Sequence, residues 1–227
     1  MMKGSLVNFA TIVIGSGLGL FIKQGIPEHY KETIMQGLGL VVGIIGLKMA
    51  LVSENIMIVV ISIAVGALLG ELLKIQERLN QFGGKLTNKL GAQYGDVGKG
   101  FVTATLVFCI GAMAIVGSIQ EGISGDASTL YAKSMIDGIA AIVFTAAMGI
   151  GVAFAAVPVL IYQGLITLCA SVFGELISQP AITELTAVGG ILIIGISINM
   201  LELKLIRIAN LLTSIPIAVL FVMLDIF

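Results

Sequence analysis

Residues 101–151 read FVTATLVFCIGAMAIVGSIQEGISGDASTLYAKSMIDGIAAIVFTAAMGIG, and this stretch decides the fold class. Its first part, 101–119, is an apolar run, and a helix needs about 20 residues to cross a bilayer. The run leads into the polar and glycine-rich segment 117–126, and a second apolar run then carries Lys133 and Asp137 near its start. Polar groups at the end of a span are costly unless they face protein or water. The stretch therefore predicts a membrane span, the fourth of the chain, that is broken beside a polar site.

The composition of the whole chain agrees with this interpretation. Of its 227 residues, 58% are hydrophobic and 11% are charged, and the mean hydropathy is +1.11. A soluble domain has about 25% charged residues, so this chain has too little polar surface to be covered by water. The runs are continuously apolar rather than alternating, which argues against a β-barrel. The sequence predicts an all-α, polytopic membrane bundle.

Eight spans are predicted, at 5–23, 33–52, 56–74, 100–119, 132–152, 155–177, 184–202 and 205–226. The segment 134–177 is almost uninterrupted and about twice too long for one crossing. Gly149, Gly151 and Pro158 are therefore the expected turn between the fifth and sixth spans. Seven or nine spans remain open.

Lysine and arginine concentrate in the loops on one side of the predicted membrane, which the positive-inside rule makes the cytoplasmic side. The cytoplasmic set is Lys23, Lys31, Lys74, Arg78, Lys85, Lys89, Lys99, Lys204 and Arg207; the other side has Lys3 and Lys133, with Lys48 near an outer helix end. We expect both termini to lie outside a bacterial inner (plasma) membrane.

The connector 75–98 has an amphipathic pattern, with Leu79, Phe82, Leu86 and Leu90 on one helical stripe and its basic residues elsewhere. Such a helix lies on the inner leaflet, where anionic lipid attracts its basic residues. A docking site for a partner protein is the alternative. Membrane lipid is the expected partner, and homo-oligomerisation remains open.

The chain shows signs of an internal repeat. Ser16, Gln36 and Glu71 recur in similar short motifs as Ser118, Asp137 and Glu175. A copy of a three-span unit must be inverted in the membrane, as in many transporters. Within a single membrane domain, 1–227, we predict repeat units at 4–74 and 102–179, the connector at 75–98, and added helices at 184–227.

The candidate substrate- or ion-binding residues are small or polar residues near the predicted break or inside spans. Asp137 is the strongest, because an ionisable residue within a span is a functional-site hypothesis by default. Its structural alternative is an i,i+4 salt bridge with Lys133. The full set is Ser16, Gly117, Ser118, Gln120, Lys133, Asp137, Gln163 and Asn199.

Other residues have structural interpretations. Glu121 and Asp126 are expected to be solvated charges of an outer loop, and Asn8 to form hydrogen bonds between helices. Small residues spaced four apart allow helix backbones to approach closely. The pairs with this spacing are Gly15/Gly19, Gly39/Gly43 and Gly66/Gly70.

Several classes of function lack the residues they require. The chain has one histidine, His29, and shows neither a catalytic triad nor metal-ligand spacing. Cys109 and Cys169 both lie inside predicted spans, so a disulfide framework is not expected. We expect no enzyme activity and no catalytic residues, no cofactor, no bound metal and no nucleic-acid partner.

The central motif GAMAIVGSIQEG at 111–122, the segment KSMIDG at 133–138 and the opening GSLVN at 4–8 are similar to those of a known family. The chain resembles, along its whole length, the YdfK/YqgA family of bacterial inner-membrane proteins (domain of unknown function 554). The resemblance implies a bacterial plasma membrane location and supplies neither a substrate nor catalytic residues.

Three functions follow from these patterns. The first is a secondary transporter of a small solute or ion, whose site uses the broken fourth span and Asp137. The second is a passive ion channel built from inverted three-helix repeats. The third is a membrane scaffold that transports nothing.

Overall fold

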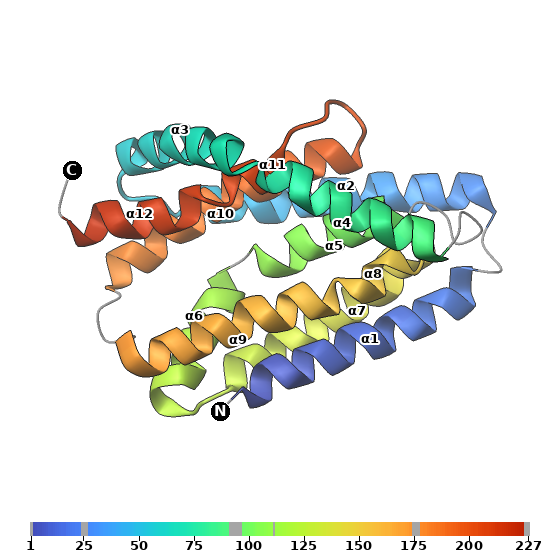
Figure 1. Ribbon diagram of the computed structural model, residues 1–227, viewed down its shortest axis with the longest axis horizontal. Helices are drawn as coiled ribbons and strands as arrows, with labels where there is room; N and C mark the ends of the chain where they lie inside the picture. Colours follow the sequence, from blue (N-terminus) through green and yellow to red (C-terminus); the bar gives the residue numbers. More distant parts are fainter. Residues whose placement is uncertain (1, 24–26, 91–96, 111, 174–177, 225–227) are drawn as a thin grey trace. The chain divides into compact units, whose positions relative to one another are not determined.

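The computed structural model describes residues 2–23, 27–90, 97–110, 112–173 and 178–224, and these residues form helices and no strand (Figure 1). The all-α class is confirmed. In chain order the helices are α1 (Lys3–Lys23), α2 (Glu28–Ala50), α3 (Ile56–Leu73), α4 (Ile75–Leu90), α5 (Val97–Cys109), α6 (Ala112–Ser124), α7 (Ser128–Met148), α8 (Gly151–Phe154), α9 (Ala156–Phe173), α10 (Gln179–Met200), α11 (Ile208–Leu211) and α12 (Ser214–Met223).

Six helical segments of the described chain are long and apolar enough to cross a membrane. They are α1, α2, α3, α7, the segment Gly151–Val172 that contains α8 and most of α9, and α10. The separation of the fifth and sixth predicted spans is confirmed: α7 ends at Met148, and the next residue, Gly149, has a φ of 90°. The predicted eighth span is instead the shorter helical segment Ile208–Met223, because residues 204–207 are not helical.

The predicted fourth span consists of two helices, α5 and α6, whose axes differ by 57°. This break lies after Cys109, earlier than predicted. The predicted segment 117–126 is helical as far as Ser124, and the chain turns only at 125–127. Gly117 lies inside α6, which continues to Ser124. Serine hydroxyls in a helix can bond back to the preceding turn without opening it, and Ser118 Oγ donates to the Ala114 carbonyl at 2.6 Å.

The chain divides into two compact units, each assembled from separate stretches of sequence. Unit 1 contains residues 1–35, 80–109 and 113–174; unit 2 contains residues 36–79, 110–112 and 175–227. These units group helices by packing, whereas the predicted repeat concerns similarity between 4–74 and 102–179. The repeat stays a prediction, and its landmark Glu175 lies outside the described residues.

In unit 1, α1 and α7 pack closely along their lengths, and α9 also packs on α1 (Figure 1). Gly4 lies against Leu130, and Gly19 lies against Thr145, so the two helices run in the same direction. A Cβ at Gly15 would overlap the backbone oxygen of Gly138. Glycine is therefore required at Gly15 for this close helix approach.

In unit 2, small residues have the same role between antiparallel helices. On α2, Gly39 lies against Leu201 and Gly46 against Gly190 of α10. Ser197 of α10 donates a hydrogen bond to the Gly39 carbonyl at 2.6 Å. The predicted packing role of the glycine pairs thus holds for described residues in both units.

The predicted amphipathic segment forms α4 over Ile75–Leu90, and the helix continues through Gly83 and Gly84. Phe82 lies 5.4 Å from Phe101 of α5, measured between ring centroids. A Cβ at Gly83 would lie 3.1 Å from the Cα of Gly98. Close backbone contact between α4 and α5 explains a glycine at this point.

Candidate functional site

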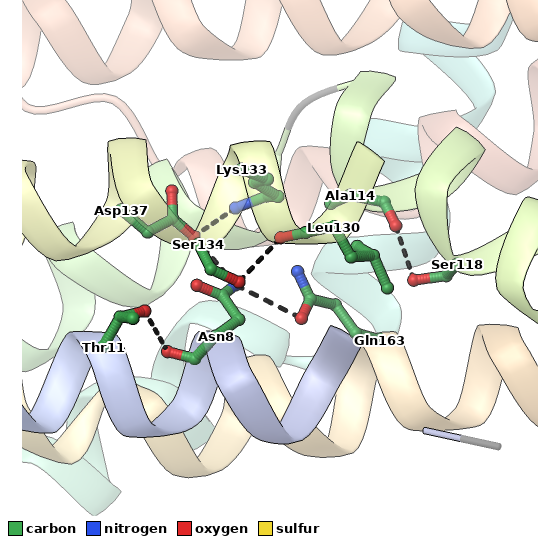
Figure 2. Close-up of polar contacts among 9 residues, drawn as sticks. All are labelled: Asn8, Thr11, Ala114, Ser118, Leu130, Lys133, Ser134, Asp137 and Gln163. Atoms are coloured by element: carbon green, nitrogen blue, oxygen red, sulfur yellow. Dashed lines mark hydrogen bonds and ion pairs between the residues drawn. The ribbon is translucent and has the colours of Figure 1, made fainter. Parts of the chain in front are cut away.

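Four polar side chains meet between the apolar helices α1, α7 and α9 of unit 1 (Figure 2). Asn8 comes from α1, Lys133 and Asp137 from α7, and Gln163 from α9; we call these four residues the buried polar cluster. Asn8 and Gln163 have no exposed surface, and Lys133 and Asp137 are each 6% exposed.

The cluster is connected through Asn8 and Asp137. Asn8 Nδ2 donates to Asp137 Oδ2 at 2.9 Å and also to Gln163 Oε1 at 3.2 Å. Lys133 Nζ donates to the same Asp137 oxygen, as an ion pair one helical turn apart. The intrahelical salt bridge considered from the sequence is therefore present. It is also linked to two other helices, which an isolated surface bridge would not be.

Two atoms of the cluster have no hydrogen-bond partner within the described structure: Asn8 Oδ1, an acceptor, and Gln163 Nε2, a donor. Leaving a buried polar atom unpaired costs about 1–3 kcal/mol, so such atoms in native proteins usually contact water or a ligand. The cluster thus has one free donor and one free acceptor beside a buried pair of opposite charges.

Two hydroxyl groups close to these side chains form hydrogen bonds within their own helices. Ser134, which lies between the two charged residues of α7, donates to the Leu130 carbonyl at 2.6 Å, and Thr11 donates to the Asn8 carbonyl at 3.0 Å (Figure 2). Cys109, at the end of α5, is close enough to Lys133 and Asp137 to interact with their charges. The observed end of α5 is therefore near the cluster.

The structure brings together three of the predicted site residues, Lys133, Asp137 and Gln163. Ser16 and Ser118 are fully buried; Ser118 bonds within α6, and Ser16 Oγ has no partner among the described residues. The remaining three lie elsewhere. A Cβ at Gly117 would lie 3.0 Å from the Leu130 side chain, Gln120 is exposed and accepts from Thr129, and Asn199 is in unit 2.

The two amide atoms of Asn199 have a local structural role. Asn199 Nδ2 donates to the Ile206 carbonyl at 2.8 Å, and Asn199 Oδ1 accepts from the Ile206 N–H at 2.7 Å. These bonds fix the non-helical segment between α10 and α11 by pairing both backbone polar groups of Ile206.

Two residues, Asn8 and Glu121, are more deeply involved in the buried polar contacts than the sequence pattern predicted. Asn8, expected to form hydrogen bonds between helices, does so at the centre of the cluster. Glu121, expected to be a solvated loop charge, is 2% exposed and lies on α6, so that expectation was wrong; Asp126 is exposed as expected. The signal for Glu121 was its spacing from Ala114 and Ser118, which places all three on one helical face.

A buried polar cluster enclosed by apolar helices of membrane-spanning length defines a polytopic helical membrane protein. The chain belongs to a family described as a protein of unknown function (DUF554), whose model matches residues 3–223. The resemblance seen in the sequence is thereby confirmed.

Two relatives match over nearly the full length of both chains. The uncharacterized membrane protein YdfK of Bacillus subtilis (strain 168) is 35% identical over 227 residues, covering 97% of this chain and 96% of its own. The uncharacterized protein YqgA of Escherichia coli (strain K12) is 27% identical over 224 residues, covering 96% and 95%. No solved structure matches this chain.

Proposed function

We propose that this protein is a secondary transporter of a small solute or ion, and that the buried polar cluster is its binding site. The observation that carries the proposal is the buried Lys133–Asp137 pair with the unpaired Asn8 Oδ1 and Gln163 Nε2 beside it. A site that binds and releases a solute needs such free groups, whereas a purely structural network would use them internally.

The energetic cost of burying Lys133 and Asp137 favours a functional role for this ion pair over a role in stabilising the fold. Removing two charges from water costs several kcal/mol per ion, and their mutual attraction often only offsets that cost. Well-packed apolar residues would stabilise the helices equally well. Ionisable residues inside membrane spans mark solute, ion or proton pathways far more often than they serve packing.

The break between α5 and α6 supports the same assignment. Half-helix ends within a membrane present free carbonyl and N–H groups, and transporter sites are commonly built from such ends. Cys109, the last residue of α5, is within electrostatic range of Lys133 and Asp137. The predicted inverted repeat is the arrangement in which sites of this kind are found.

A passive ion channel is the second candidate. The 57° bend between α5 and α6 is the observation that favours it, because a re-entrant segment of this shape can line a pore. Unlike a carrier, a channel shows no saturation and no counterflow when reconstituted in vesicles.

We place the protein in the bacterial inner membrane with both termini outside, on the basis of its lysine and arginine distribution. We expect its contacts to include membrane lipid, and we expect no enzyme activity. Homo-oligomerisation, which the sequence leaves open, is measured directly by the mass of the purified protein in detergent.

The testing experiment is a thermal-shift screen of the purified protein against alkali cations, inorganic anions, amino acids and small carboxylates. A ligand that binds the folded state raises the apparent unfolding temperature, by an amount that grows with the logarithm of its concentration relative to its Kd. We expect one class to stabilise the protein and to lose this effect in Asn8→Ala. The matched control is Asp126→Asn, because Asp126 is exposed outside the cluster. A shift that survives Asn8→Ala unchanged would place the site elsewhere.

A further inference from the structure

Glu121 of α6 is a buried carboxylate outside the buried polar cluster. Its side chain is 2% exposed, and Oε1 accepts a hydrogen bond from the Gly4 N–H at 3.1 Å, near the start of α1. Oε2 has no partner among the described residues. The hydroxyl of Ser5, the next residue of α1, is also fully buried and unpaired.

Among the described residues, no charged group on the helices around Glu121 is paired with it. Lys3 of α1 is exposed, and Lys133 of α7 is paired with Asp137. Helix α9 has no acidic or basic residue; its titratable groups are Tyr162 and Cys169. The described structure has no ion-pair partner for Glu121. An ionised carboxylate buried in this way is strongly disfavoured without a compensating charge.

Glu184 of α10, in unit 2, is a matched comparison because it is also a buried carboxylate, 3% exposed. Its carboxylate accepts from Ser53 Oγ at 2.7 Å, from the Glu54 N–H at 2.8 Å and from the Asn55 N–H at 2.9 Å. Both oxygens are therefore satisfied by donors, as an ionised carboxylate requires. Glu121 has a single donor for its two oxygens, and this difference points to a missing positive partner.

We infer that Glu121 binds a single positive charge, a proton or an alkali cation, at Oε2. Asn8 lies one helical turn beyond Gly4 and Ser5 on α1, so the same helix links Glu121 to the buried polar cluster. A second carboxylate that binds a positive charge, one helical turn from the solute site, is suited to coupling movement of that charge to transport of the solute. That coupling role rests on the proposed transport function, whereas the binding of a positive charge does not.

The test is labelling of the purified protein in lipid nanodiscs with dicyclohexylcarbodiimide, an apolar reagent that modifies protonated carboxyl groups. The carboxyl O–H adds across one C=N bond: its oxygen bonds to the central carbon and its proton goes to nitrogen. Migration of the acyl group from oxygen to the other nitrogen then gives a stable acylurea, which mass spectrometry assigns to a residue. We expect Glu121 to be labelled and Glu184 to remain unlabelled.

Titrations separate the two sources of charge. If the ligand is a proton, labelling falls as pH rises and is insensitive to Na⁺ or K⁺ at constant ionic strength; if it is an alkali cation, that cation protects Glu121. Infrared spectra between two pH values provide a readout independent of reagent access, since a protonated carboxyl band should disappear in Glu121→Gln and persist in Glu184→Gln.

Glu121 without label at every pH, with no such band and no effect of either cation, would overturn the inference. Glu121 would then be only a permanently ionised cap of α1. If Glu121 is labelled but no ligand stabilises the protein in the thermal-shift screen, the charge-binding site at Glu121 stands and the proposed transport function does not.

Discussion

Asn8 Nδ2 lies 2.9 Å from Asp137 Oδ2, although the two residues are 129 positions apart in the sequence. This hydrogen bond joins the first helix of the chain to the charged pair of α7, and the same amide group reaches Gln163 of α9. The contact makes Asp137 the shared acceptor for an ammonium and an amide group from two different helices. Disturbing Asp137 should therefore affect both ligand binding and helix packing.

We predict that Asp137→Asn abolishes ligand binding and lowers the free energy of unfolding by about 3–5 kcal/mol, since it leaves Lys133 buried without its counter-charge. The double variant Lys133→Met, Asp137→Leu should recover most of that stability without recovering binding. Thermal unfolding and ligand-induced shifts in detergent measure both quantities. Intact binding in Asp137→Asn would favour the purely structural role of the salt bridge.

Gly15→Ala should destabilise the protein by about 1–3 kcal/mol, because the added Cβ would overlap the Gly138 backbone and force α1 away from α7. Gly17→Ala is the matched control: nothing lies within 4 Å of its Cβ position, and alanine favours a helix. We expect this control to be neutral or slightly stabilising in thermal unfolding. Equal behaviour of the two variants would contradict the close packing of α1 and α7.

The predicted orientation places α4 in the cytoplasm and the turn between α6 and α7 outside. An impermeant thiol reagent added to intact cells should label Ser124→Cys but not Gln81→Cys, in a background with Cys109 and Cys169 replaced by serine. Both positions are exposed in the structure. Labelling of Gln81→Cys but not of Ser124→Cys would show that the protein has the opposite orientation in the membrane.

Asp126, in the turn before α7, should stabilise the protein in a pH-dependent way. The backbone N–H and the hydroxyl of Ser128 lower the pKa of the Asp126 carboxyl, and Oδ1 accepts from that N–H at 2.9 Å. A lowered folded-state pKa gives stability that is present above the unfolded pKa, about 4, and is lost as pH falls through the folded value. The difference in unfolding temperature between wild type and Asp126→Ala should shrink below about pH 4. If the difference in unfolding temperature does not change with pH, ionisation of Asp126 is not the source of the stabilisation.

The class of protein and several local features were predictable from the sequence because they depend on composition and short-range pattern. Low charge and long apolar runs indicate membrane helices in any arrangement. The turn at Gly149 and the amphipathic helix α4 depend on residues within a few positions of each other. The Lys133–Asp137 pair was predictable for the same reason, since one helical turn separates its members.

Only the tertiary structure decided which helices meet and which polar groups remain unpaired. The position of the break after Cys109 was not visible, because the glycines at 117–122 serve helix packing: a Cβ at Gly122 would overlap the Thr167 backbone of α9. The burial of Glu121 arises from its contact with Gly4, 117 residues away. Such long-range contacts carry no periodic signal along the chain, so the sequence alone determined the membrane helices, and packing between them determined the site.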